Sequence, residues 1–330
     1  RRPRRGPRAV GRGAAGPMSI DILGLGAVAV DDLVYVEEYP RPDTKVRVVR
    51  RERHAGGRTG TALVAAARMG RRCAYAGVLG DDELSRFVVD GLAAEGVDTA
   101  AVVRRPDARP YHSTIVVALK DLTRTILSDA SGVVGADSSS PAEALVRSAT
   151  VLFVDHVGLE AMTRAARLAR DSGIPVVGDF DRRFEAPFDE LLALVDHLVV
   201  PLAFALRITG AADAAAAVRG LWNDGRSAVV ATDGAAGSWY ASRELPGRVV
   251  HQPAFRVEPV DTNGCGDVFH GCYAALLCEG VPAARRVRFA AAAAAMKATR
   301  RGGQQGIPSR EEADGFLAER SAEALPREVA

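Results

Sequence analysis

Short apolar runs alternate with amphipathic helical stretches along this chain, and the alternation restricts the fold more than any other feature. The runs expected to be buried strands are Ile20–Val28, Cys73–Leu79, Val151–Val154, Pro175–Gly178, His197–Val200 and Ala228–Thr232. The stretches expected to be helices are Thr61–Met69, Leu84–Glu95, Ala142–Arg147, Leu159–Asp171 and Ala212–Trp222. Strands that alternate with helices predict an α/β fold with a mostly parallel central sheet and helices on both faces.

Two stretches depart from this alternation. Residues 34–52 contain a proline-rich turn followed by alternating valines, and residues 102–120 alternate polar and β-branched residues. Both patterns predict half-exposed strands outside the buried sheet. We expect one α/β domain over residues 18–320, a disordered basic tail at 1–17 and a short C-terminal tail at 321–330.

The composition, with 48% hydrophobic and 25% charged residues, is that of a globular protein. No apolar run approaches the ~20 residues that cross a bilayer, so no membrane association is expected. Six arginines lie within residues 1–17, and without them the formal net charge falls from +2 to −4. The rest of the chain has no basic and aromatic interleaving, so no nucleic-acid binding is expected. Four cysteines without paired spacing indicate reduced thiols and a cytoplasmic protein.

The segment Asp261–Gly271 places two aspartates around a glycine turn at the start of a helical pattern. Small residues at Gly264, Cys265 and Gly266 leave backbone N–H groups uncovered at the positive end of a helix, which favours phosphate oxygens. Asp267 would lie beside that anion and accept a proton from a hydroxyl. The segment therefore predicts phosphoryl transfer to an alcohol, with an ordinary glycine turn before a helix as the alternative.

This segment resembles the signature Asp-Thr-x-Gly-Ala-Gly-Asp-x-Phe of the ribokinase-like (PfkB) carbohydrate kinases, with Cys265 in place of the usual alanine. The resemblance extends from about Ile20 to Phe316. It implies a ribokinase-like fold whose half-exposed strands form a small lid over a sugar, and transfer of phosphate from ATP to a primary hydroxyl with Asp267 as the base. It also implies Mg²⁺ as a cofactor and homodimers that form through the lid strands.

The resemblance also implies which residues hold the sugar. They are Asp31, Lys45, Gly56, Gly57, Arg58 and Thr61. Arg58 and Thr61 stand where the family usually has asparagine, so Arg58 either meets an acidic substrate group or points to solvent. Lys45 matches a lysine that meets an anionic group in sulfofructose kinase.

A further set of residues is implied at the nucleotide. They are Thr232, Asp233, Gly234, Gly237, Thr262, Lys297 and Gly303. Residues 232–237 resemble the family's turn near the nucleotide phosphates, with a plain hairpin turn as the alternative. Residues 297–308 resemble the segment by the adenine, which in many members includes a loop for a monovalent cation such as K⁺. The family's Asn-x-x-Glu pair near Mg²⁺ is replaced by Pro201 and Phe204, so no protein ligand for Mg²⁺ is predicted.

Two segments favour one branch of the family. Residues 39–46 resemble both ketohexokinase and sulfofructose kinase, and residues 251–255 resemble sulfofructose kinase, which favours a ketose or a related sugar. The segment that begins at Asp155 lacks an arginine of sulfofructose kinase, so the sugar stays open. A nucleoside kinase of the same superfamily and a catalytically silent sugar-binding relative remain as alternatives. An aromatic or apolar pocket for a base near the lid would favour the nucleoside kinase.

Overall fold

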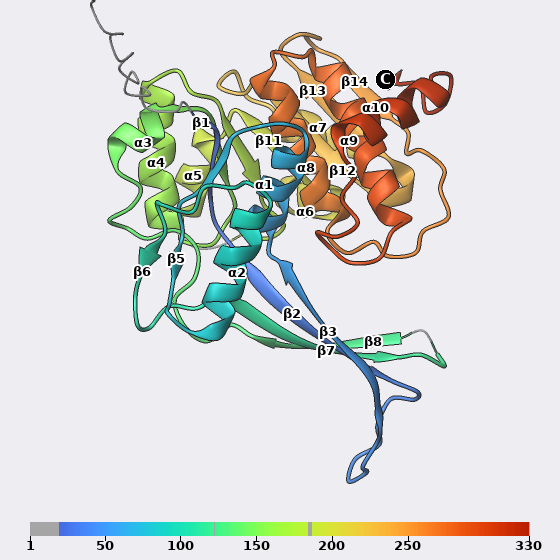
Figure 1. Cartoon of the computed structure of the whole chain (residues 1–330). Helices are drawn as coiled ribbons and strands as arrows, with labels where there is room; N and C mark the ends of the chain where they lie inside the picture. Colours follow the sequence, from blue (N-terminus) through green and yellow to red (C-terminus); the bar gives the residue numbers. More distant parts are fainter. Residues whose placement is uncertain (1–19, 122, 184–186, 330) are drawn as a thin grey trace, which may run out of the picture.

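A central sheet organises the computed structural model, which describes residues 20–121, 123–183 and 187–329; the expected tail at 1–17 lies outside the described residues. The strands of this sheet are β1 Ile20–Leu25, β4 Cys73–Tyr75, β9 Ala149–Val154, β10 Val176–Asp179, β11 His197–Pro201, β12 Ala228–Thr232, β13 Ser238–Ser242, β14 Val249–Gln252 and β15 Arg327–Val329. Their order is β15-β14-β13-β12-β11-β10-β9-β1-β4. Figure 1 shows this sheet together with the helices that flank it. The strands from β12 to β4 are parallel, and β13, β14 and β15 continue the sheet antiparallel.

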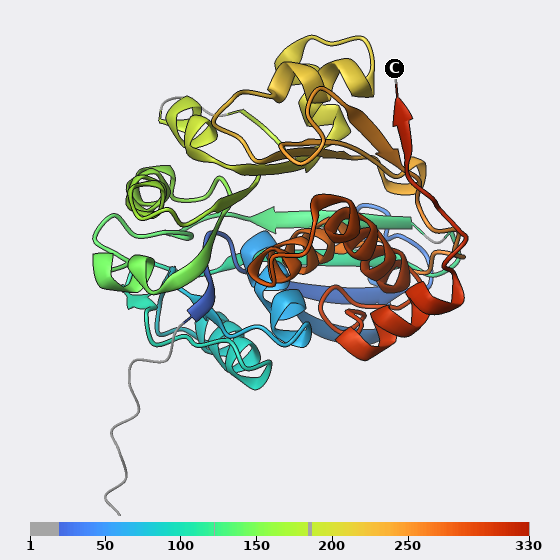
Figure 2. The same cartoon turned by 90° about the horizontal axis from the view of Figure 1, so that it is seen from above.

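Helices cover both faces of this sheet (Figure 2). One face carries α1 Arg58–Arg68, α2 Glu83–Ala94, α8 Cys265–Cys278, α9 Ala283–Ala298 and α10 Arg310–Glu319. The other face carries α3 Glu143–Arg147, α4 Leu159–Asp171, α5 Phe188–Leu194, α6 Leu202–Thr209 and α7 Ala214–Leu221. Strand residues alternate between two apolar cores, with Val151 and Phe153 in the first and Leu152 and Val154 in the second. The predicted parallel sheet with helices on both faces is confirmed.

Several predicted boundaries differ from the structure. The expected strand Ile20–Val28 ends at Leu25, because the chain turns away at Gly26, which has φ +150°. α6 was not predicted, because it follows β11 directly and the two form one apolar run without a polar loop between them. Residues 321–330, expected as a tail, include β15, which covers the edge of β14. Among the described residues, none of the helices combines the length and the apolarity needed to span a membrane.

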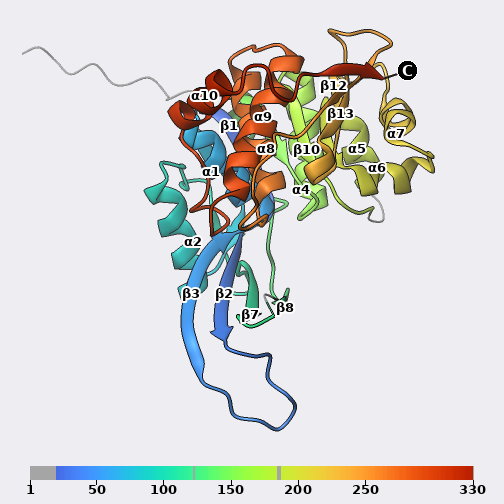
Figure 3. The ribbon, with the colours of Figure 1, turned by 90° about the vertical axis from the view of Figure 1, so that its right-hand side faces the viewer.

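A second sheet, here called the projecting sheet, extends away from this body (Figure 3). Its strands are β2 Ala29–Val36, β3 Val48–Gly56, β7 Tyr111–Ala118 and β8 Thr123–Asp129, in the order β3-β2-β7-β8. The expected stretches 34–52 and 102–120 coincide with it only in part, because residues 37–47 form a loop and β6 Val103–Arg104 pairs instead with β5 Val78–Leu79. β8 was not predicted, because its exposed sequence lacks a regular apolar alternation.

Candidate active site

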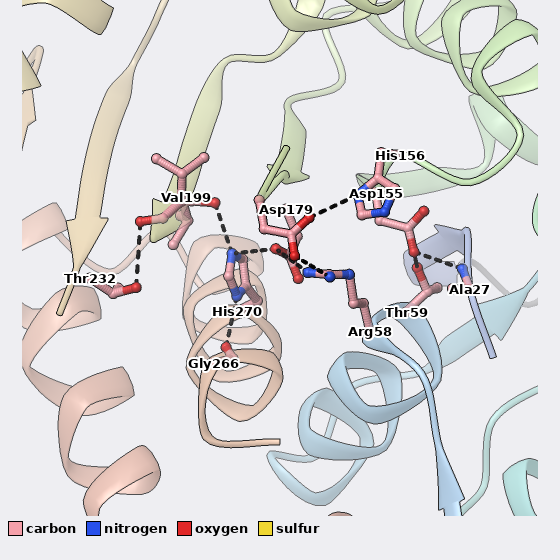
Figure 4. A network of polar contacts seen from close by, with 12 residues as sticks. Ala27, Arg58, Thr59, Asp155, His156, Asp179, Val199, Thr232, Gly266 and His270 are labelled. Carbon is pink, nitrogen blue, oxygen red and sulfur yellow. Dashed lines mark hydrogen bonds and ion pairs between the residues drawn. The ribbon is translucent and has the colours of Figure 1, made fainter. Parts of the chain in front are cut away.

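Charged side chains gather where the carboxyl ends of β9 and β10 face the N-terminal end of α1 (Figure 4). Parallel strands present their carboxyl ends at one edge of a sheet, so residues distant in sequence meet there. The Arg58 guanidinium donates to Asp181 Oδ2 at 2.5 Å, and its second terminal nitrogen lies 3.9 Å from Asp179 Oδ1. Arg58 therefore faces carboxylates instead of pointing to solvent.

The glycine turn before α8 lies where three distant segments converge. Gly264 caps the helix with φ +78°. A Cβ added there would lie 3.5 Å from Gly303 Cα and 3.6 Å from Thr61 Cγ2. A Cβ added to Gly266 would meet no atom within 4 Å. The turn therefore lies against Thr61 and Gly303 on the side of Gly264, while the space beside Gly266 is open to a ligand.

Asp267 occupies the first turn of α8 and is half-buried. Burial and the nearby Asp179 carboxylate raise the pKa of Asp267 to about 7, although the positive charges of Arg58 and His270 act in the opposite direction. A carboxyl with a pKa near neutrality is suited to take a proton from a hydroxyl at neutral pH. The position and the pKa of Asp267 fit the role of a general base.

His270, which sequence reasoning did not place in the site, connects α8 to the sheet. Its Nδ1 lies 2.7 Å from Gly266 O, and its Nε2 lies 2.9 Å from Val199 O and 3.5 Å from Asp179 Oδ1. His270 follows Gly266 by four residues, so the two share one helix face. That spacing was the sequence signal for this contact.

Asp155 is a second residue that sequence reasoning did not assign to the site. Its side chain is fully buried, and it accepts hydrogen bonds from Ala27 N at 2.7 Å, Val157 N at 2.7 Å and Thr59 Oγ1 at 3.0 Å. Burial raises the pKa of Asp155 to about 6. The carboxylate joins the segment after β1, the loop after β9 and the start of α1. The signal available in the sequence was an acid directly after a buried strand.

Asp31 and the two glycines expected at the sugar do lie together. Asp31 is in β2, and burial raises its pKa while a hydrogen bond with Ser113 of β7 lowers it. A Cβ on Gly56 would lie 3.3 Å from Asp31 Oδ2. Gly57 has φ +87°, and a Cβ there would lie 2.4 Å from Val28 Cα. The base of the projecting sheet therefore joins α1 through a close backbone contact that only glycine permits.

Lys45 and Thr61 are the two other residues expected at the sugar, and their binding to it stays a prediction. Lys45 lies in the exposed loop between β2 and β3, and this loop is at the end of the projecting sheet away from the body (Figure 3). Thr61 is buried, and its hydroxyl accepts from Gln304 Nε2 at 3.5 Å. The hydroxyl of Thr61 thus connects α1 to the C-terminal loop.

The turn expected at the nucleotide is a hairpin between β12 and β13. Asp233 N donates to Gly237 O at 2.8 Å, and Thr232 Oγ1 donates to Val200 O at 3.4 Å. Asp233 and Gly234 are exposed, whereas Gly237 packs closely, since a Cβ there would lie 2.2 Å from Gln252 O. The hairpin geometry is that of the simpler alternative, and a role in nucleotide binding stays a prediction.

Asp261 and Lys297 fix the segment that leads into the glycine turn. The Asp261 carboxylate accepts from Asn263 N and from Gly302 N, each at 2.9 Å. Lys297 is fully buried and donates to Asp261 O at 2.8 Å. The hydrogen bonds of the Lys297 ammonium are therefore with backbone carbonyls. Thr262, by contrast, is exposed beside the turn.

The described residues contain no cluster of three or more His, Cys, Asp or Glu that could hold a metal ion. Phe204 stands where the family has the glutamate of its Asn-x-x-Glu pair. It is buried and packs edge-on against Phe188, with ring centroids 6.5 Å apart. The side chain at this position therefore belongs to the apolar core and is not an oxygen ligand.

Known proteins of one family resemble this chain in sequence and fold. A model of the pfkB family carbohydrate kinases matches residues 20–310. A ribokinase from Haemophilus influenzae is 28% identical over 300 residues, which cover 89% of this chain and 97% of that relative. A solved structure from Agrobacterium tumefaciens with a provisional ribokinase assignment has a TM-score of 0.82 and 28% identity, covering 91% of this chain and 98% of that one. A ribokinase from Arabidopsis thaliana complexed with ribose and ATP has a TM-score of 0.78 and 22% identity, covering 91% of this chain and 99% of that one.

Proposed function

The chain belongs to the pfkB family of carbohydrate kinases, phosphotransferases with an alcohol acceptor, and we propose that it transfers the γ-phosphate of ATP to a primary hydroxyl of a small sugar. One observation carries the proposal. Asp267, with a pKa of about 7, lies in the first turn of α8 beside the open face of the Gly264–Gly266 turn. A base and an anion site are thereby adjacent, which is the arrangement that phosphoryl transfer to an alcohol requires.

In this mechanism Asp267 takes the proton of the sugar hydroxyl, and the N–H groups at the start of α8 stabilise charge on the transferring phosphoryl group. Arg58 opposes the rise in the pKa of Asp267, so a larger fraction of the carboxyl is ionised at neutral pH. ATP, with Mg²⁺ on its phosphates, supplies the phosphoryl group when bound. That the ion is held mainly through those phosphates stays a prediction.

Asp31 and the adjoining glycines are proposed to hold sugar hydroxyls. The contact of Gly56 with Asp31 places a carboxylate at the junction between the projecting sheet and α1. We assign the projecting sheet the role of a lid that limits water, because hydrolysis of ATP competes with transfer to the sugar. Association of two chains through this sheet stays a prediction.

The structure favours a neutral sugar over a sugar acid. Asp181 already forms a hydrogen-bonded ion pair with Arg58, so the guanidinium charge is largely offset before a substrate binds. Lys45 lies in the exposed loop between β2 and β3, and this loop is at the end of the projecting sheet away from the body. The sequence favours a ketose, whereas a relative with 28% identity is a ribokinase. Ribose and ketoses are therefore the first substrates to compare.

The test is sugar-dependent release of ADP from ATP and Mg²⁺ across ribose, deoxyribose, ketoses, sugar acids, sulfosugars and nucleosides. We expect a neutral sugar to give the largest signal and Asp267→Asn to abolish most of it. Release of ADP with nucleosides alone would favour the nucleoside kinase. Folded protein that is silent with every substrate, or an Asp267→Asn variant with near-full turnover, would contradict the proposal.

A further inference from the structure

The use of lysine in this chain is unusual. Of its 43 basic residues only three are lysines, at positions 45, 120 and 297, and the others are arginine. Lys45 and Lys120 are exposed, whereas Lys297 has an exposed fraction of 0%. A buried ammonium is costly unless its N–H groups are hydrogen-bonded, so a specific set of acceptors is expected around Lys297.

The acceptors are backbone carbonyls from two segments. Lys297 Nζ donates to Asp261 O at 2.8 Å and to Arg300 O at 3.4 Å. Carbonyl oxygens arranged around a single positive charge are the ligands by which proteins replace the water shell of K⁺. The ammonium of Lys297 thus occupies the kind of position that a bound monovalent cation would take.

The surrounding loop leaves room for the lysine side chain and for little else. A Cβ added to Gly306 would lie 2.8 Å from Lys297 Cδ and 3.1 Å from Arg300 Cβ. Gly302, which begins the loop, has φ +81°, a conformation that favours glycine. An ammonium is compact, whereas the wider planar guanidinium of arginine has a different donor geometry. This explains a lysine at this position in a chain that otherwise uses arginine.

The same contacts hold the segment that enters the glycine turn. Val260 N and Asp261 N donate to Ala298 O at 2.7 Å and 3.0 Å, and Gly302 N donates to Asp261 Oδ2 at 2.9 Å. The Lys297 charge also reaches the turn, because it opposes the rise in the pKa of the Cys265 thiol that burial causes. Loss of the ammonium would leave the Asp261 carbonyl without its bond to Lys297, three residues before Gly264.

We propose that the Lys297 ammonium acts as a built-in monovalent cation that positions the Gly264–Asp267 turn, so that nucleotide binding requires no K⁺. The cation loop implied by the sequence at residues 297–308 is therefore filled by the chain itself. Lys297 is a positioning residue, because it acts on the phosphates through the turn. The inference rests on the proposed function only in assigning nucleotide phosphates to that turn.

The first experiment measures binding of ADP with Mg²⁺ to the full chain by isothermal titration calorimetry. Chloride salts of K⁺, Na⁺ and tetramethylammonium are compared at equal ionic strength. We expect dissociation constants that agree within about twofold. A tenfold or greater gain with K⁺ over tetramethylammonium would overturn the role of Lys297 alone. A chain that binds ADP in none of these salts would overturn this inference and the proposed function together.

Two substitutions then separate charge from volume. Lys297→Ala opens the carbonyl site, whereas Lys297→Met fills it without a charge. In tetramethylammonium chloride both variants should bind ADP roughly tenfold more weakly than the unsubstituted chain. K⁺ or NH₄⁺ should restore binding only in Lys297→Ala. Lys120→Ala, at an exposed lysine, controls for the loss of one positive charge.

An Lys297→Ala variant that binds ADP like the parent in every salt, or weakly in every salt, would overturn the proposal. The first result would show that the ammonium is dispensable for binding. The second would show a purely structural role. If Lys297→Ala does not fold, the salt comparison on the unsubstituted chain still decides the question.

Discussion

Replacing Asp267 with asparagine is expected to increase stability while it removes activity. The pKa of Asp267 is raised from 3.8 to about 7, because burial and Asp179 disfavour its charged form. A difference of about three pKa units corresponds to about 4 kcal/mol of folding free energy at pH values above 7. The side chain is only half-buried, so water screens part of this cost. We therefore expect Asp267→Asn to raise the free energy of unfolding by about 1–3 kcal/mol at pH 8.

The sign of the pH dependence follows from the direction of the pKa change. Between about pH 4 and pH 7 the folded state holds a proton on Asp267 that the unfolded state has lost. Stability from this group is therefore complete below about pH 4 and is lost as the pH rises to about 7. Asparagine cannot ionise, so the advantage of the variant should be largest at pH 8 and should shrink by about half at pH 5.5.

Urea denaturation at pH 8 and pH 5.5, without nucleotide and in phosphate-free buffer, measures both effects. Asp224→Asn is the matched control, because that carboxylate is exposed. Turnover of Asp267→Asn should fall by ~10²–10⁴ at pH 8, and by less at pH 5.5, where most of the parent carboxyl is already protonated. A variant that is no more stable than the parent at pH 8, or whose advantage is the same at both pH values, would refute the reasoning.

Three further substitutions test the rest of the site. Arg58→Met should move the acidic limb of the pH profile of kcat/KM to higher pH by about one unit, because the Arg58 charge lowers the pKa of Asp267. An acidic limb that stays in place would argue against this coupling. Gly57→Ala should lower stability by about 1–3 kcal/mol in thermal unfolding, since its Cβ would lie 2.4 Å from Val28 Cα; a neutral effect would mean that the backbone relaxes freely. Asp155→Asn should cost about 1–3 kcal/mol in the same assay, because an amide has one acceptor oxygen for three donors, and an unchanged melting temperature would contradict that role.

The central sheet could be predicted because its parallel strands are buried on both faces and read as uninterrupted apolar runs, as in Val151–Val154. β8 is different. Thr123–Asp129 is mostly exposed and has no apolar pattern of its own, and it forms a strand by pairing with β7. β13 pairs antiparallel with β12, and β14 pairs antiparallel with β13; both segments are short and carry a weak signal of their own.

The candidate site was predictable where one contiguous segment contains it. The Gly264–Asp267 turn is of this kind, because the glycines, the helix start and the acid are neighbours in sequence. Contacts across the chain were not predictable in the same way, and Arg58 meets Asp181 over a separation of 123 residues. Only the order of the strands places these two together. An acid directly after a buried strand is a signal for such residues once the order is known.

The convergence of three segments at Gly264 also has a consequence for biosynthesis. Thr61, Gly264 and Gly303 lie far apart in the sequence, and Asp261 can receive its bonds from Lys297 and Gly302 only after those later residues have left the ribosome. A nascent chain that has emerged only as far as α8 has its strands β1 to β14 but lacks these bonds. Because domains fold as units during synthesis, we expect the glycine turn at Gly264 to become rigid only after residue 303 has emerged. A chain made only as far as α8 would therefore contain the turn without the later contacts that hold it.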